Sequence, residues 1–425
     1  MRKNINISKV NIHFKQPRGL HIIAFMVFCL CLAIAPSITV MSQYGKIDLF
    51  YNRDDHLFVI FFAGIFGCIS NYFFGSTKSI IHGLQFTIIA VALSLVNNML
   101  LFSCAALWIG IATVIVNLMF NLSSFYLKTD LRRLYGFIGI YSSALLGIAV
   151  GIAIYFLIFK NLFYFKIFYL AVIIFLLVFF LKNSYRLNTS LTNQTERINI
   201  SFYGVLTIFF IFSLILFYLF LNLNVFSSFN LIVLPLSLIY LHILTITNNK
   251  ENGAQLLKYI YFSLALIIVN KVIYLNFLKY ENAINAINSI NPAYLNSSTS
   301  TLLFLIAGYI MCLLIYAGWR FNLITLKIES IINTKLIKSM LYIEFIRVFM
   351  ITIGIFSANA LISNLMLIFA TLLALVLNVL IIPVYFSLGK ILAGGKNETV
   401  TTTLLYLIFS SLIFVSFLYD IYISL

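Results

Sequence analysis

Apolar residues occupy thirteen long stretches of this chain, and polar residues gather in the connections between them. Each stretch exceeds the roughly 17 residues that a helix needs to cross the hydrocarbon core of a bilayer. Helices are expected, because an open strand would leave its backbone groups unpaired in lipid. The stretches predicted to span are 20–40, 57–74, 79–96, 98–121, 136–159, 163–181, 203–222, 229–246, 257–277, 301–319, 337–358, 360–387 and 399–423.

Basic residues fall mainly in alternate connections, and this alternation predicts the orientation. Counted with the N-terminal side as the inner side, twenty Lys and Arg residues lie inside and five outside. Such a bias predicts a cytoplasmic N-terminus in a multi-pass protein of the cell inner membrane. It also accounts for the net charge of +16, so nucleic-acid binding is not expected.

Composition excludes a water-soluble fold, because 63% of the residues are hydrophobic and only 9% are charged. The five cysteines and five histidines show no spacing typical of metal ligands, and no glycine-rich loop for nucleotide phosphates is present. We therefore expect no metal, no cofactor and no enzymatic activity. The lipid bilayer is the expected surrounding, and the expected state is a monomer.

The polar segments divide the chain into three parts. Residues 1–182 form an N-terminal helix bundle, 183–256 a polar linker with an inserted helix hairpin, and 257–425 a C-terminal bundle. In this division a short connection, 223–229, joins the two hairpin helices. Thirteen helices leave the C-terminal bundle one helix short of a twelve-plus-two arrangement.

Several different short motifs follow one another along the chain in a characteristic order. They are Pro17-Arg18-Gly19-Leu20, Gly64 to Gly75 with Asn71, Gly83, Tyr126, Asp130-Leu-Arg132-Arg133 followed by Gly136-Phe137, Tyr141, Gly147, Ser289-Ile-Asn291-Pro292, and Pro383-Val384 with Ser387. In order and spacing the chain resembles the proton-coupled oligopeptide transporters, the POT/PTR family of the major facilitator superfamily. The resemblance covers about 16–150 and 285–390 and implies an all-α fold of two six-helix bundles with an inserted helix pair.

The departures from the family pattern concern the charged groups. The family's Glu-x-x-Glu-Arg motif would fall at Val27, Leu30 and Cys31, and its helix-twelve glutamate at Asn378. Of its Lys-Pro-Asn motif only Asn117 remains. The resemblance assigns proton coupling to those carboxylates, and an amide does not titrate. Coupling has therefore either moved to another residue or been lost.

Three charged residues are expected at membrane depth, where an ionised side chain costs about 2.5–3.5 kcal/mol on insertion scales. Lys271, beside Asn270, is expected either to bind a substrate carboxylate or to extend to the outer interface. Glu344 and Arg347 are three residues apart and share a helix face. They form either a structural ion pair or a displaced proton site with its modulator.

The remaining candidates are assigned through the resemblance. Asn117, Tyr141 and Asn378 lie on helices that line the cavity in that family, where they would bind a polar substrate; the alternative is hydrogen bonding between helices. Asp130, Arg132 and Arg133 are expected in a cytoplasmic loop as a gating cluster.

The leading hypothesis is a secondary transporter that works by alternating access on a small peptide or peptide-like metabolite, with proton coupling altered or lost. The alternative is a lipid-linked saccharide flippase or a polysaccharide or drug exporter. Such a protein should keep several cationic side chains in its lumen, and this chain offers only Lys271 and Arg347.

Overall fold

The computed structural model describes residues 19–32, 53–96, 99–126, 132–159, 161–187, 201–221, 223–248, 298–320 and 334–357, with a few single positions elsewhere. Within these ranges the chain is helical and contains no strand. The helices are α1 (Gly19–Cys31), α3 (Arg53–Phe74), α4 (Ser76–Leu93), α5 (Leu100–Ser124), α6 (Arg132–Ala153), the π-helix η4 (Ile154–Phe159), α7 (Leu162–Asn183), the short 3-10 turn η5 (Ser184–Arg186), α8 (Phe202–Leu221), α9 (Leu223–Asn248), α12 (Ser298–Arg320) and α13 (Thr334–Phe356).

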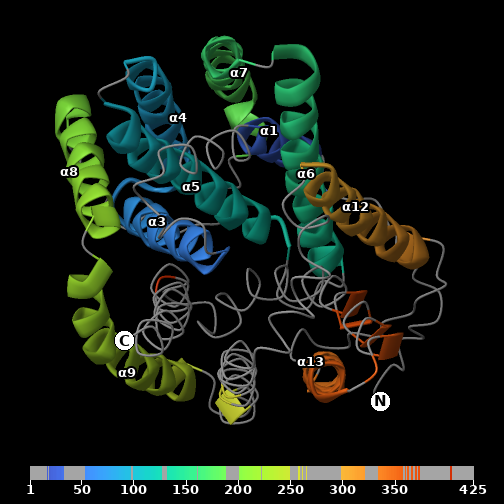
Figure 1. Ribbon diagram of the computed structural model, residues 1–425. Helices are drawn as coiled ribbons and strands as arrows, with labels where there is room; N and C mark the ends of the chain where they lie inside the picture. Colours follow the sequence, from blue (N-terminus) through green and yellow to red (C-terminus); the bar gives the residue numbers. More distant parts are fainter. Residues whose placement is uncertain are drawn as a thin grey trace, which may run out of the picture.

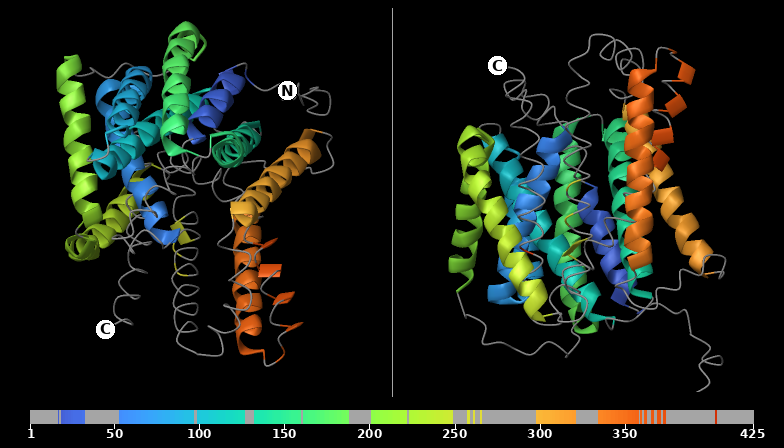
Figure 2. Two further views of the ribbon diagram at one scale, coloured as in Figure 1. Left: turned by 45° about the horizontal axis from the view of Figure 1, so that its top comes forward. Right: turned by 90° about the horizontal axis from the view of Figure 1, so that it is seen from below.

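Ten of the thirteen expected stretches overlap these helices, and of the first stretch the part 33–40 lies outside the described residues. Apart from single positions, the stretches 257–277, 360–387 and 399–423 lie outside the described residues, so the helix count stays a prediction. Among the described helices, four are long and apolar enough to cross a bilayer: 76–93, 102–124, 135–159 and 162–183. Seen from the side, the helices run roughly alongside one another, as membrane spans do (Figure 2).

Two expected connections are wrong. The segment expected to join the hairpin helices is itself helical, because α9 begins at Leu223 and only Asn222 separates it from α8. Arg132 and Arg133, expected in a loop, are the first two residues of α6. Hydropathy locates only the part of a helix that lies in lipid, whereas the backbone hydrogen bonds continue into the polar flanks.

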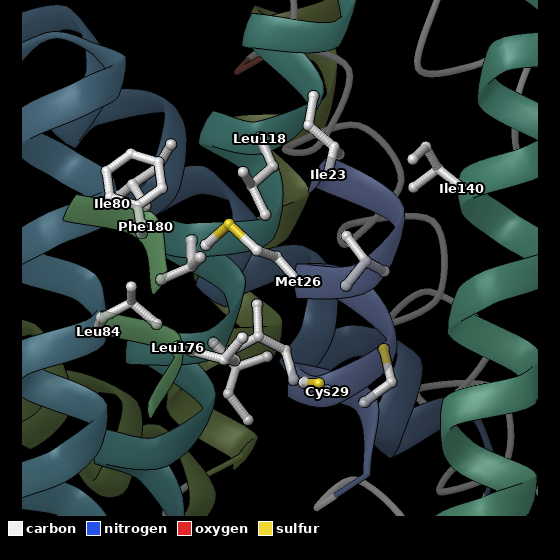
Figure 3. Close-up of a cluster of buried hydrophobic side chains, with 14 of the residues drawn as sticks. Ile23, Met26, Cys29, Ile80, Leu84, Leu118, Ile140, Leu176 and Phe180 are labelled. Atoms are coloured by element: carbon white, nitrogen blue, oxygen red, sulfur yellow. The ribbon is translucent and has the colours of Figure 1, made fainter. Parts of the chain in front are cut away.

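α1 packs against α5, α6 and α7, and its apolar side chains share one buried cluster with Ile80 and Leu84 of α4 (Figure 3). Its side chains Ile23, Met26 and Leu30 are fully buried against residues of those helices. A helix that is apolar on all sides is expected in such a place. A tight turn joins α3 to α4 at Gly75, whose φ of 78° favours glycine.

Small residues allow α1 and α6 to approach closely. A Cβ atom added to Gly147 would lie 2.4 Å from the carbonyl oxygen of Phe28, and one added to Gly151 would lie 2.2 Å from that of Leu32. The sequence Gly147-Ile-Ala-Val-Gly151 has the GxxxG spacing that brings helix backbones together in membranes. Beyond Gly151 the α-helix gives way to the π-helix η4.

The inserted helix α8 packs against α3, α4 and α5 (Figure 1). Its buried side chains Val205, Phe209 and Leu216 recur at helical spacing, and the Phe209 ring meets the edge of Phe66 at a centroid distance of 4.7 Å. The opposite face exposes large apolar residues: Phe210, Ile211, Leu214, Ile215 and Tyr218. An apolar surface of this extent indicates contact with lipid.

We expect Phe209→Ala to loosen this contact and to lower the stability of the folded protein by roughly 1–2 kcal/mol. The value lies below that for a soluble core, because lipid is as apolar as the protein interior and only the packing contribution is lost. Thermal unfolding in detergent measures the effect. Ile211→Ala, on the face of α8 opposite Phe209, is the control and should leave the melting temperature unchanged.

Candidate functional site

The three positions where the resemblance places the family's charged motif lie in the apolar core around α1. Val27, Leu30 and Cys31 are 1%, 0% and 2% exposed and belong to one buried cluster. The hydroxyl of Tyr169 on α7 donates a hydrogen bond to the carbonyl oxygen of Leu30, at 3.0 Å. Charged side chains here would be desolvated at a cost of several kcal/mol each, on the order of magnitude known for buried ions. The residues present at these positions are apolar and closely packed.

Asn117 joins α5 to α3. Its Nδ2 donates to the carbonyl oxygen of Gly67 at 3.1 Å, to Oγ of Ser70 at 3.4 Å and to the carbonyl oxygen of Thr113 in its own helix at 2.7 Å. The side chain is fully buried. These contacts are those of an interhelical hydrogen bond, one of the two roles that the sequence left open.

A second amide lies one turn further along α5. Oδ1 of Asn121 accepts a hydrogen bond of 2.7 Å from Oγ of Ser76, the first residue of α4. Asn117 and Asn121 thus connect α5 to α3 and to α4 in the half of the bundle that holds the α3–α4 turn. The small residue Gly83 continues the close α4–α5 contact, since an added Cβ would lie 2.8 Å from Cγ2 of Val114.

Glu344 and Arg347 pair on α13, as their spacing predicts. Arg347 donates from Nε to Oε2 of Glu344 at 2.8 Å and from Nη2 to Oε1, so the guanidinium and carboxylate form a two-bond fork. Their side chains are 14–19% exposed. Neighbouring side chains on α13, among them Tyr342, Phe345 and Phe349, are exposed and apolar. The pair therefore neutralises two charges among exposed apolar side chains of α13.

Helix α6 has an open position. A Cβ added to Gly139 would meet no described atom within 4 Å, in contrast to Gly147 two turns later. Ser143, one turn from Gly139, is half-buried, and its hydroxyl donates to the carbonyl oxygen of Gly139 at 3.0 Å. α6 lies between α1 on one side and α12 on the other (Figure 1). Tyr141 is half-buried on the same helix.

The structure describes only some of the predicted site residues. Arg132 is half-buried at the start of α6. Asp130, Asn270, Lys271 and Asn378 lie outside the described residues, as does the side chain of Arg133.

Two features were missed from the sequence. The GxxxG spacing at Gly147 and Gly151 could have revealed the α1–α6 contact. Lys166 on α7 donates from Nζ to the carbonyl oxygen of Ser94 at the end of α4. A cation at this place meets the negative end of the helix dipole, and no sequence signal predicted the pairing.

The chain was compared with known proteins. No family model matches it, and no curated protein matches it. Among solved structures it is similar to a peptide transporter POT in complex with sulfate, with 14% identity, a TM-score of 0.58, and coverage of 95% of this chain and 88% of that one. It is similar to a POT family transporter in complex with 5-aminolevulinic acid, with 17% identity, a TM-score of 0.58, and coverage of 95% and 90%.

A third similar structure is that of a bacterial homologue of the human drug peptide transporters, with 9% identity, a TM-score of 0.51, and coverage of 95% and 98%. The apolar helices and these similarities define the class: an all-α, multi-pass membrane protein. Within that class the chain has the fold of the POT family peptide transporters.

Proposed function

We propose that the protein is a secondary transporter of the POT family that moves a small peptide or peptide-like metabolite by alternating access. The observation that carries the proposal is the match of 95% of the chain to a POT family transporter at a TM-score of 0.58. Solved relatives by fold hold 5-aminolevulinic acid and alafosfalin, which are compact polar molecules. The protein acts as a monomer in the inner membrane, with its N-terminus in the cytoplasm.

Its substrate passes between two bundles, formed by 1–182 and 257–425, with the hairpin in 183–256 attached beside them. Support comes from α6, which touches both α1 and α12 and is open at Gly139. Ser143 offers a hydroxyl on the same side of the helix. The further cavity candidates are Tyr141, Asn270, Lys271 and Asn378. Asp130, Arg132 and Arg133 form the cytoplasmic gate.

Proton coupling is altered or lost. A proton carrier needs a titratable group that alternately faces the two sides, and Val27 and Leu30 at the family's glutamate positions are apolar and buried. Glu344 is a carboxylate of the described residues that is expected at membrane depth. Both of its oxygens accept hydrogen bonds from Arg347. The protein therefore works either as a uniporter or with Glu344 as a displaced proton site.

We expect proteoliposomes containing the protein to take up labelled di- or tripeptides, either with little dependence on an inward proton gradient or with a dependence that Glu344→Gln removes. Gly139→Trp should lower uptake at least tenfold without loss of folded protein, because a side chain at this position meets open space. Thr207→Trp, on the outer face of α8, is the matched control.

Peptide uptake that needs the proton gradient in both the native protein and Glu344→Gln would refute altered coupling. The complete absence of uptake across a panel of peptides and amino-acid analogues would refute the function.

A further inference from the structure

Asn117 and Asn121 each leave one polar atom without a partner in the described part of the protein. The atoms are Oδ1 of Asn117, a hydrogen-bond acceptor, and Nδ2 of Asn121, a donor. The two residues are 0% and 6% exposed. Being four residues apart on α5, they are neighbours on one helix face. Oγ of Ser79, fully buried on α4, is a third such atom in the same layer of helices.

The surroundings fix the orientation of the Asn117 amide. Nδ2 of Asn117 donates to two carbonyl oxygens, those of Gly67 and Thr113, so its amide cannot be reversed without losing both contacts. Its Oδ1 must therefore be the free atom. Asn121 uses Oδ1 to accept from Ser76, which leaves both protons of its Nδ2 to be satisfied.

We propose that these atoms form a site for an ordered water molecule between α3, α4 and α5. The water donates to Oδ1 of Asn117 and accepts from Nδ2 of Asn121, and Ser79 is within the same layer to complete its bonds. Buried polar groups are almost always paired, and a buried water typically makes about three hydrogen bonds. A metal cation does not fit this set, because it cannot accept from an N–H group.

The water completes a polar connection through three helices. It runs from Ser76 at the start of α4 to Asn121, through the water to Asn117, and on to Ser70 and the carbonyl oxygen of Gly67 on α3. In a bilayer no outside water competes for these groups, so the connection holds the three helices together as one unit. Asn117 is thus a positioning residue for α3 and α5. The inference stands without the proposed transport function.

A structure of the full chain at a resolution that shows ordered water tests the site directly. The expected result is a density peak within hydrogen-bond distance of Oδ1 of Asn117 and Nδ2 of Asn121. Direct contact between the two amides, with no peak, would overturn the proposal.

A thermal double-mutant cycle gives a second test. Asn117→Leu and Asn121→Leu should each lower the melting temperature by several degrees, and the double variant by clearly less than the sum, because the water is lost in either single variant. Additive shifts would contradict a shared water. Asn183→Leu on α7 is the control, since its amide makes only a local bond to the carbonyl oxygen of Phe179 and should cost little.

The same measurement separates water from a cation. If the Asn121 amide were reversed, its oxygen would face the site. The site would then be lined by the amide oxygens of Asn117 and Asn121, which are suitable ligands for sodium. A melting temperature that rises with sodium, against an equal concentration of choline, and does so only when Asn121 is intact, would overturn the water assignment. Equal melting temperatures in the two salts are expected.

Discussion

Gly151→Ala should destabilise the protein strongly, whereas the same substitution at Gly139 should stabilise it. The added methyl group of Gly151→Ala would lie 2.2 Å from the carbonyl oxygen and 3.0 Å from Cα of Leu32, so the backbones of α1 and α6 must move apart. Overpacking typically costs about 1–3 kcal/mol, and a contact with rigid backbone belongs at the upper end. Around Gly139 the new methyl group meets open space and contributes its helix propensity, about 0.5–1 kcal/mol.

The two variants have identical chemistry, so the comparison isolates the packing. Thermal unfolding in detergent should place their melting temperatures on opposite sides of the native value, with Gly151→Ala lower by several degrees. Gly147→Ala should resemble Gly151→Ala, because its methyl group would lie 2.4 Å from the carbonyl oxygen of Phe28. Equal melting temperatures for the variants at Gly139 and Gly151 would show that α1 and α6 are not in close contact.

The helices could be predicted well because a bilayer allows few alternatives. Long apolar runs in lipid must be helical, which is why the β-branched residues of α7 (Leu162–Asn183) do not form a strand. Helix ends were predicted less well. α3 begins at Arg53 and includes Asp54 and Asp55, whereas hydropathy predicted a start at 57. Polar residues carry no hydropathy signal for a helix, although they continue its hydrogen bonds outside the hydrocarbon core.

The sequence predicts which site residues are polar, but not which neighbouring helix each side chain faces. The sequence identified Asn117 as a polar residue at depth, and only the arrangement of α3 beside α5 decides that its amide bonds Gly67 and Ser70. Gly139 and Gly147 are both glycines of α6, two turns apart, and one faces open space while the other touches α1. Such differences depend on where neighbouring helices lie, which a single sequence with 14–17% identity to its structural relatives does not specify. The pair Glu344 and Arg347 was predictable because both partners lie on one helix, where spacing alone fixes the geometry.

Arg347→Met should destabilise the protein more than removal of both charges does. The substitution leaves the carboxylate of Glu344 without its two-bond partner on a helix whose surroundings are apolar. Breaking a buried pair from one side costs about 3–5 kcal/mol, and the partial exposure of this pair places the expected loss nearer 2–3 kcal/mol. In the double variant Glu344→Gln/Arg347→Met no charge remains unpaired, so most of the stability should return. Equal losses in the single and double variants would mean that the pair contributes no electrostatic coupling.

Uptake by the same variants separates the two roles of the pair. If Glu344 and Arg347 are purely structural, the double variant should transport at a rate per folded molecule close to that of the native protein, with the same response to a proton gradient. If Glu344 carries the proton, the gradient response should disappear in Glu344→Gln and in the double variant, because an amide has no proton to exchange. The double variant therefore separates the two cases, because its stability largely returns in both and its gradient response disappears only in the second. This result would decide whether the pair neutralises charge in lipid or has taken over the coupling that Val27 and Leu30 cannot provide.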